Sequence, residues 1–425
     1  MIRTLLSSAA VLALAGAATS QDYAIVGGKV WTGSEAGTIE NGAVIIDGGV
    51  VSFVGPADNA EIGGLRTIDA SGKWVTPGII SAYSRVGLAE VSAEDSTNDT
   101  GAATTVYNAA LDASDGFNPA AASVAVTRIE GVTRIAGAPA ATTSPFAGQG
   151  FIADTSGNPN SVTAPKAFMH VALNESGAAL AGGSRPALWT LFRSALADSR
   201  MFPSRYQAHK EGGDALNRID AEAFAPAARG DQLILVSASR ASDLLKVIEI
   251  AQARPELDVA IVGAEEGWTV ASELADAGIP VIVDPFRNLP ERFEQLGASQ
   301  RNAERLVAAG VETAFAHLGD SSHQSRLVLQ SAGNAVANGV DHDAALAAIT
   351  AAPARIFGLD DHGTLEEGKV ADIVIWDGDP LEVSSSPDAV IINGAETSLE
   401  TRQTKLRNRY LGLAADDKPY AYRKP

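Results

Sequence analysis

Few residues in this chain of 425 amino acids are suited to chemistry, and the histidines are the first to consider. There are six, and no His-x-His or His-Glu-x-x-His spacing, which would bring imidazoles together on one metal ion, occurs among them. His317 and His323 flank Asp320, so one alternative is a zinc site rebuilt around these three side chains. The other alternative is that they are ordinary hydrogen-bonding groups near a strand end. Because the chain has no cysteine, a thiolate metal site and a cysteine nucleophile are excluded.

A second group of residues suits anion binding. Arg85 carries a permanent charge and a planar set of donors, so it can pair with a carboxylate through two parallel hydrogen bonds. One hypothesis is a buried ion pair between Arg85 and Asp320 that has a structural role only. The competing hypothesis is a pocket that binds a small carboxylate. The predicted substrate-binding residues are Tyr83, Arg85, Ser237, Ser239, Arg240 and His323.

The charge balance narrows the range of partners. The formal net charge is -19 at pH 7, and such a surface repels phosphate backbones and anionic lipids. We therefore expect neither nucleic acid nor membrane partners. Residues 1–20 place one arginine before an apolar run and small residues, which is the layout of a secretory signal peptide. An exported chain without cysteine fits a periplasmic or secreted location, with a mature chain that begins near Gln21.

The elements that must position these residues follow two patterns, and the first is β-rich. Between residues 21 and 76, short runs such as 43–46 and 50–54 alternate with glycine-bearing turns, which predicts an antiparallel β unit. A segment of about 50 residues rarely forms a stable sandwich alone, so this unit should need strands from elsewhere. Matching β runs occur at residues 371–376 and 389–394, near the other end of the chain.

The middle of the chain follows the second pattern. Continuous apolar runs at residues 233–236, 259–262 and 280–283 are separated by helical stretches at 241–252 and 266–277. Apolar strands that alternate with helices indicate a parallel sheet covered on both faces. The spacing of about 20 to 30 residues per unit suits either a βα barrel or a doubly wound sheet. Periodicity alone leaves both architectures open.

Several motifs carry a family resemblance over nearly the whole mature chain. Residues 77–80 form a Pro-Gly turn followed by two isoleucines, and residues 363–381 form a glycine-bounded turn and an apolar strand. Further motifs lie at residues 87–91 and 97–99. Together they resemble the amidohydrolase superfamily, in particular its imidazolonepropionase-like branch. In that family the first motif leads from a β-sandwich into a barrel, and the second returns the chain to the sandwich.

The resemblance implies an α/β fold with two parts. A (β/α)8 TIM-like barrel should occupy residues 77–361. A composite β-sandwich should form from the N- and C-terminal segments, residues 21–76 and 362–397. The tail, residues 398–425, should pack on the body of the protein.

The resemblance also implies where metal ligands would lie, and the sequence departs from the family there. The two histidine positions after the first barrel strand are occupied by Tyr83 and Arg85. Ser237 and Gly263 stand where later strands would supply histidines, and only Asp320 keeps an acidic ligand position. We therefore expect no metal cofactor and assign Asp320 as the catalytic candidate. A divalent ion needs three or more such ligands, and Arg85 would repel it.

Two classes of function follow from the resemblance. By family, the chain would hydrolyse C-N bonds other than peptide bonds, of the cyclic amide type. The replaced ligands argue against catalysis by a metal-activated water, so whether the chain is an enzyme stays open. The alternative is a non-catalytic protein: a partner subunit of an intact amidohydrolase, a homo-oligomer, or a binder of a small anionic ligand.

Overall fold

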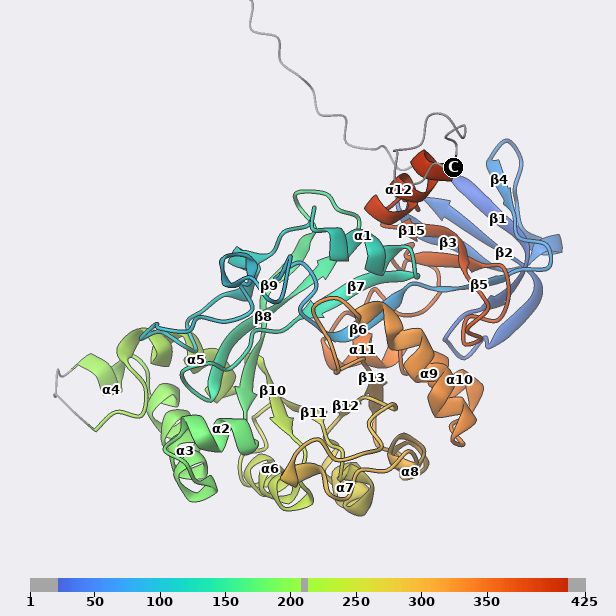
Figure 1. Ribbon diagram of the computed structural model, residues 1–425. Helices are drawn as coiled ribbons and strands as arrows, with labels where there is room; N and C mark the ends of the chain where they lie inside the picture. The colour runs from blue at the N-terminus through green and yellow to red at the C-terminus, as the bar shows by residue number, and fades with distance from the viewer. Residues whose placement is uncertain (1–21, 208–212, 412–425) are drawn as a thin grey trace, which may run out of the picture.

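The computed structural model describes residues 22–207 and 213–411, and two eight-stranded sheets organise them (Figure 1). The predicted signal peptide and the end of the predicted tail lie outside the described residues. Within the described residues, no helix is both long and apolar enough to cross a membrane.

The first sheet combines both ends of the chain. Its strands are β1 (Tyr23–Trp31), β2 (Thr38–Asp47), β3 (Val50–Pro56), β4 (Arg66–Asp69), β5 (Trp74–Pro77), β14 (Ile373–Trp376), β15 (Pro387–Ile392) and β16 (Ala395–Glu396). They follow the order β16-β15-β14-β5-β1-β2-β3, with β4 paired to β1. The antiparallel pair of β5 and β14 joins the N-terminal strands to the C-terminal ones, so the blue and red segments of Figure 1 lie side by side. The composite β-sandwich is therefore confirmed, while its predicted residue boundaries stay predictions.

The chain crosses from this sheet to the second one at Gly78. Its N–H donates to the carbonyl of Asp372 at 2.8 Å, between the end of β5 and the start of β6. A Cβ atom at position 78 would lie 2.2 Å from Oγ1 of Thr133. Only glycine fits this crossing, because no side-chain atom can approach another so closely.

The second sheet curves into a barrel. Its strands are β6 (Ile79–Ser84), β7 (Val132–Gly137), β8 (Phe146–Asp154), β9 (Val162–Ala172), β10 (Leu233–Ala238), β11 (Val259–Gly263), β12 (Val281–Val283) and β13 (Thr313–Phe315). They pair in chain order from β6 to β13. The seam between the first and last strands is bridged by residues 348–349, whose carbonyls accept from Phe315 N and Ile80 N at 2.8 Å each.

The barrel confirms the predicted TIM-like fold with one difference. All neighbouring strands are parallel except β8, which is antiparallel to both β7 and β9. No helix separates β7, β8 and β9. A strand that returns without a crossover helix has to run antiparallel, so this part of the barrel is a meander rather than a βα repeat.

Most of the helices surround the barrel, while α12 lies beside β15 (Figure 1). The helices are α1 (Ala122–Arg128), α2 (Glu175–Leu180), α3 (Arg185–Arg200), α4 (Ser204–Gln207), α5 (Arg218–Arg229), α6 (Ala241–Ala253), α7 (Ala271–Ala277), α8 (Asn302–Ala308), α9 (Val328–Ala337), α10 (His342–Ala347), α11 (Ala351–Ile356) and α12 (Arg402–Leu411). Helix α6 buries Leu244, Val247 and Ile248 and leaves its other face in solvent. Helix α12 buries none of its residues.

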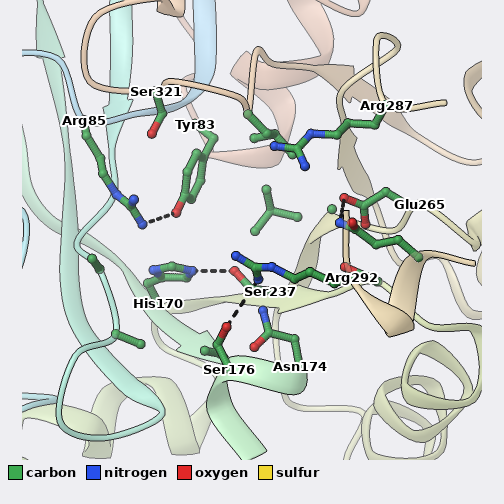
Figure 2. A pocket seen from close by; sticks show the side chains of 18 residues that line it. Tyr83, Arg85, His170, Asn174, Ser176, Ser237, Glu265, Arg287, Arg292 and Ser321 are labelled. Carbon is green, nitrogen blue, oxygen red and sulfur yellow. Dashed lines mark hydrogen bonds between the residues drawn. The ribbon is translucent and has the colours of Figure 1, made fainter. Parts of the chain in front are cut away.

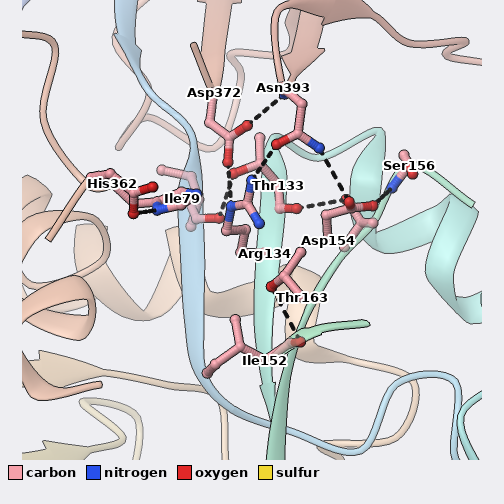
Figure 3. Close-up of polar contacts among 12 residues, drawn as sticks. Ile79, Thr133, Arg134, Ile152, Asp154, Ser156, Thr163, His362, Asp372 and Asn393 are labelled. Carbon is pink, nitrogen blue, oxygen red and sulfur yellow. Dashed lines mark hydrogen bonds and ion pairs between the residues drawn. The ribbon is translucent and has the colours of Figure 1, made fainter. Parts of the chain in front are cut away.

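A buried ion pair fastens the two sheets to each other. Arg134 on β7 donates from Nε to Oδ2 of Asp372 at 2.6 Å, and both side chains are almost fully buried (Figure 3). Asn393 accepts from Nη2 of Arg134 at 2.6 Å and donates from Nδ2 to Asp154 at 3.2 Å. Because each charged group has its partners, the desolvation of the pair is compensated.

Candidate functional site

A cavity of about 300 Å³ opens at the carboxyl ends of the barrel strands. Its wall includes Tyr83 at the end of β6, His170 near the end of β9, Ser237 on β10 and Gly263 at the end of β11 (Figure 2). Loops beyond the strands contribute the other lining residues. The carboxyl ends of barrel strands are where barrel proteins build their sites, so this cavity is the candidate functional site.

Tyr83 and Arg85 form one side of the cavity. The Nη2 group of Arg85 donates to the Tyr83 hydroxyl at 2.8 Å, and Nε donates to the carbonyl of Ala138 at 3.3 Å. The backbone N–H of Arg85 donates to the carbonyl of Ser321 at 2.9 Å. Since a guanidinium only donates, the Tyr83 oxygen is the acceptor in this pair, and its own hydrogen is left for another acceptor.

His170 and Ser237 form the floor between β9 and β10. His170 Nδ1 lies 2.7 Å from the carbonyl of Pro139, and Nε2 lies 2.8 Å from Oγ of Ser237. A carbonyl only accepts, so Nδ1 carries the hydrogen and Nε2 accepts from the Ser237 hydroxyl. Burial lowers the pKa of His170 to about 4, and the positive charge of Arg85 acts in the same direction. The imidazole is therefore neutral near pH 7, and the Ser237 hydroxyl presents only lone pairs to the cavity.

Glu265 lies on the far side of the cavity from Arg85 (Figure 2). Its side chain is buried, and Oε1 accepts from Nε2 of Gln295 at 2.8 Å. The second oxygen, Oε2, is buried and has no hydrogen-bond partner among the described residues. A buried carboxylate oxygen without a donor is rare in folded proteins, so it needs an explanation.

The backbone at the end of β11 keeps this carboxylate in contact with the cavity. Gly263 has a φ of 107°, and the next residue, Ala264, has a φ of 45°. A Cβ at position 263 would lie 3.0 Å from the carbonyl of Ala238 and 3.2 Å from Oε2 of Glu265. The left-handed conformation of a non-glycine residue is strained, and such strain collects at functional sites.

Two more arginines reach the cavity from the loop after β12. Arg287 pairs with Glu291 and lies 4.0 Å from Oδ2 of Asp284, while Arg292 donates from Nη1 to Oγ of Ser176 at 3.3 Å. Three guanidinium groups thus line a cavity whose wall contains one carboxylate, that of Glu265. Arg287 is paired with an acidic side chain, but Arg85 and Arg292 form no ion pair among the described residues, so their charges can attract an anion.

The loop that carries these arginines is anchored by Glu294. This side chain is buried and accepts from the backbone N–H of Glu175 at 2.6 Å and from Nη2 of Arg185 at 3.1 Å. Burial raises the pKa of the Glu294 carboxyl. Arg185 also donates to Asp243 at 2.8 Å, so the loop is tied to the starts of α3 and α6.

The structure brings together some of the predicted substrate-binding residues. Tyr83, Arg85, Ser237 and Ser239 all line the cavity. Arg240 is exposed at the start of α6 and is not part of the lining.

The predicted residues after β13 lie elsewhere. His323 is bonded to Ser92 at 3.3 Å and to the carbonyl of Glu90 at 3.2 Å. Asp320 is exposed and accepts from the backbone N–H groups of Ser322 and His323. It makes no ion pair with Arg85 in the described part of the chain, so the hypothesised buried pair is not formed. The assignment of Asp320 as the catalytic residue stays a prediction.

Four important lining residues were not predicted as site residues. They are His170, Glu265, Arg287 and Arg292. Glu265 follows the apolar run at residues 259–262 that the sequence predicts as a strand, and the carboxyl end of a barrel strand is the signal that could have found it. His170 lies near the end of β9, a strand that was not among those predicted from the sequence. The two arginines lie in an irregular loop, where sequence pattern gives no position.

The residues at the positions where the resemblance implies metal ligands do not fit a divalent ion. By that resemblance these residues are Tyr83, Arg85, Ser237 and Gly263, which all line the cavity, and the Arg85 guanidinium adds a positive charge. No group of three or more histidine and acidic side chains able to hold a metal occurs in residues 22–207 and 213–411. The alternative zinc site is also not assembled.

Its members instead form separate pairs. His317 lies 3.8 Å from Asp284, and His323 lies 3.6 Å from Asp320. We therefore derive no chemical step through a metal.

Comparison with known proteins places these features in a family context. Residues 335–397 match the sequence model of the amidohydrolase family. The amidohydrolase tasK of Hapsidospora irregularis is 46% identical over 57 residues, which is 13% of this chain and 6% of that protein. A 5-methylthioadenosine/S-adenosylhomocysteine deaminase of Symbiobacterium thermophilum is 38% identical over 55 residues, 13% of each chain. The chain thus spans only a small part of the length of these curated relatives.

The crystal structure of an amidohydrolase from Thermotoga maritima is similar over most of the chain. The match has a TM-score of 0.78 and 24% sequence identity, and it covers 88% of this chain and 99% of that one. At this identity the likeness establishes the fold alone. The chain therefore shares the fold of that amidohydrolase, and its C-terminal segment matches the amidohydrolase family model.

Proposed function

We propose that this chain binds a small carboxylate-bearing molecule in the cavity at the barrel rim. The observation that carries the proposal is the convergence of Arg85, Arg287 and Arg292 on a cavity whose wall has a single carboxylate. Guanidinium groups that share a cavity repel one another, most strongly where water is limited, and a bound anion relieves that repulsion. In this proposal the barrel positions the site, and Tyr83 and Arg85, at positions where the resemblance implies metal ligands, form part of the anion site.

Tyr83 and Arg85 form the primary contact in this proposal. The Tyr83 hydroxyl has a hydrogen left to donate, and its oxygen is polarised by the Arg85 guanidinium that donates to it at 2.8 Å. A ligand carboxylate placed beside this pair would accept from the phenol and from the guanidinium. Hydrogen bonds to charged groups contribute about 1.5–3 kcal/mol each, enough for a measurable affinity from this pair alone.

Hydrolysis of a cyclic amide-type C-N bond is the second candidate, and the Ser237–His170 hydrogen bond of 2.8 Å favours it. A serine bonded to an imidazole is the arrangement of a nucleophile and its base. However, burial lowers the pKa of His170 to about 4. Protonation at pH 7 would then cost about 4 kcal/mol, so His170 is a poor base for Ser237. The pair is better suited to holding an oriented acceptor than to catalysis.

The cellular location and the partner of the protein are also part of the proposal. We place it in the periplasm or outside the cell, on the basis of the signal-peptide layout of residues 1–20. We further propose that it assembles either with an intact amidohydrolase, as a non-catalytic subunit, or with copies of itself as a homo-oligomer. Co-expression with a histidine-complete amidohydrolase, followed by affinity purification, tests the partnership. Elution of the two chains in separate peaks would count against it.

Calorimetric titration with simple carboxylates tests the binding function. Wild-type protein should bind glutarate, and Arg85→Gln should weaken that binding about tenfold or more because it removes a charged donor. Arg240→Gln is the matched control, since Arg240 is exposed and outside the cavity. Equal affinities for the two variants, or no binding to the wild type, would overturn the proposal.

A further inference from the structure

We propose that the ligand is an amino acid, whose ammonium group binds an acceptor subsite formed by Glu265 and Ser237. This inference rests on the proposed anion binding, and it adds a second, oppositely charged subsite in the same cavity. An acidic amino acid fits best, because Arg287 and Arg292 supply further positive charge on the Glu265 side.

The first observation is the unpartnered oxygen of Glu265. This side chain is 5% exposed, yet its Oε2 atom has no donor among the described residues. Gln295 holds the other oxygen at 2.8 Å, which fixes the carboxylate in place. A buried charge that lacks one of its hydrogen bonds is unfavourable, and a cationic N–H donor from a ligand in the cavity would supply it.

The second observation is that residue 263 has no side chain to cover this oxygen. At Gly263 a Cβ would come within 3.2 Å of Glu265 Oε2 and 3.4 Å of Ser239 Oγ, so any side chain there would fill the space in front of both. Gly263 and Ala264 both adopt left-handed conformations at this point. For Ala264 that conformation is unfavourable, and such strain collects at functional sites.

The third observation is the direction of the hydrogen bond that the Ser237 hydroxyl makes. Its hydroxyl hydrogen points to Nε2 of His170, so the lone pairs of its oxygen face the cavity. The strand that carries Ser237 pairs directly with the strand that ends at Gly263, with Ser237 opposite Val262 and Ala238 opposite Gly263. The two acceptors therefore come from adjacent strand ends and can share one ammonium group.

Two acceptors lie across the cavity from the Tyr83–Arg85 pair, next to the guanidinium groups of Arg287 and Arg292. Tyr83 and Arg85 present hydrogen-bond donors on the β6 side, and Glu265 and Ser237 present acceptors on the β10 and β11 side (Figure 2). A simple dicarboxylate uses only the donors and leaves Glu265 unsatisfied. A molecule with a carboxylate and an ammonium group satisfies both sides. The site should therefore prefer it to a dicarboxylate, which leaves the buried Glu265 oxygen without a donor.

Titrations with L-glutamate and glutarate test the inference, because these molecules differ only in the amino group. The wild type should bind L-glutamate at least about tenfold more tightly than glutarate. Glu265→Gln should remove this preference while leaving glutarate affinity equal or higher, because a negative charge near the dicarboxylate is lost. Glu273→Gln on the exposed face of α7 is the control and should keep the preference.

The outcomes separate the two proposals. If both ligands bind equally well and both depend on Arg85, the anion site stands and the ammonium subsite is refuted. If neither ligand binds the wild type, the anion site and the inference fail together. Should Glu265→Gln prove unstable, Ser237→Ala gives an independent test, and it should reduce L-glutamate affinity several-fold without weakening glutarate. An unchanged preference in Ser237→Ala would overturn the shared subsite.

Discussion

Arg85 donates a hydrogen bond of 2.8 Å to the hydroxyl of Tyr83, two residues before it in the chain. Both side chains stand where members of the superfamily are expected to carry metal-binding histidines. The positive charge at this position belongs to the Arg85 side chain, whereas the resemblance implies a bound metal ion there. An anion bound at this position would meet a guanidinium and a phenol.

Tyr83→Phe tests the role of the hydroxyl. The variant removes a donor to the ligand and a partner of Arg85, while Arg85 keeps its contact with the carbonyl of Ala138. We expect carboxylate affinity to fall about fivefold to tenfold, with little change in melting temperature. Tyr107→Phe, at an exposed tyrosine outside the cavity, serves as the control. Unchanged affinity by calorimetry would show that the phenol does not touch the ligand.

Arg85→His tests the metal-ligand positions. This substitution restores one imidazole, but Tyr83, Ser237 and Gly263 still offer no further histidine or carboxylate. A stable zinc site needs three or more such ligands, so the variant should remain free of stoichiometric zinc. Elemental analysis after incubation with zinc and dialysis gives the answer. One tightly held zinc per chain, in the variant or in the wild type, would contradict the ligand assignment.

The buried imidazole of His170 predicts a pH dependence of stability. Its folded-state pKa of about 4 lies below the ordinary value of 6.5. Between these values the unfolded chain binds a proton that the folded chain does not, so stability rises with pH and falls on acidification. The loss between pH 7 and pH 5 should be about 2 kcal/mol from this residue.

Urea unfolding at both pH values measures that contribution. The wild type and His170→Gln should differ in their pH dependence, because the variant lacks the titrating group. The difference between the wild type and the variant excludes the contribution of other titrating groups. One of these is His362, because burial also lowers its pKa. Parallel stability profiles for the two proteins would mean that His170 is not protonated on unfolding in this range.

The ion pair between the sheets predicts a large stability effect. Arg134→Met leaves Asp372 buried without its cation, and breaking such a pair costs about 3–5 kcal/mol. Arg66→Met breaks an exposed pair with Glu396 and should cost no more than about 1 kcal/mol. Chemical denaturation of the two variants measures both. A loss at Arg134 as small as that at Arg66 would show that the buried pair does not fasten the sheets.

The fold was largely predictable because hydrophobic patterning marks it. The apolar runs in the middle of the chain were predicted as strands, and the structure contains them as β10, β11 and β12. The β runs at the two ends of the chain were predicted to form one sandwich, and they share one sheet. The direction of β8 was not predictable. Its sequence is buried along its whole length and looks like any other barrel strand, and only its short connections determine that it runs antiparallel.

The site was predictable only where strand ends determine it. Tyr83 and Ser237 lie at the ends of strands, so their place at the rim follows from the barrel. Arg287 and Arg292 reach the cavity because the buried carboxylate of Glu294 anchors their loop, a tertiary contact that no local pattern encodes. Asp320 was expected at the rim, but it caps an exposed turn after β13.

A crystal structure of the protein grown with glutarate or L-glutamate tests the central claim most directly. The account predicts a ligand carboxylate within about 3 Å of both the Arg85 guanidinium and the Tyr83 hydroxyl. With L-glutamate, the ammonium nitrogen should lie at a similar distance from Glu265. Density for a metal ion coordinated at the barrel rim, or a ligand bound away from Arg85, would contradict it.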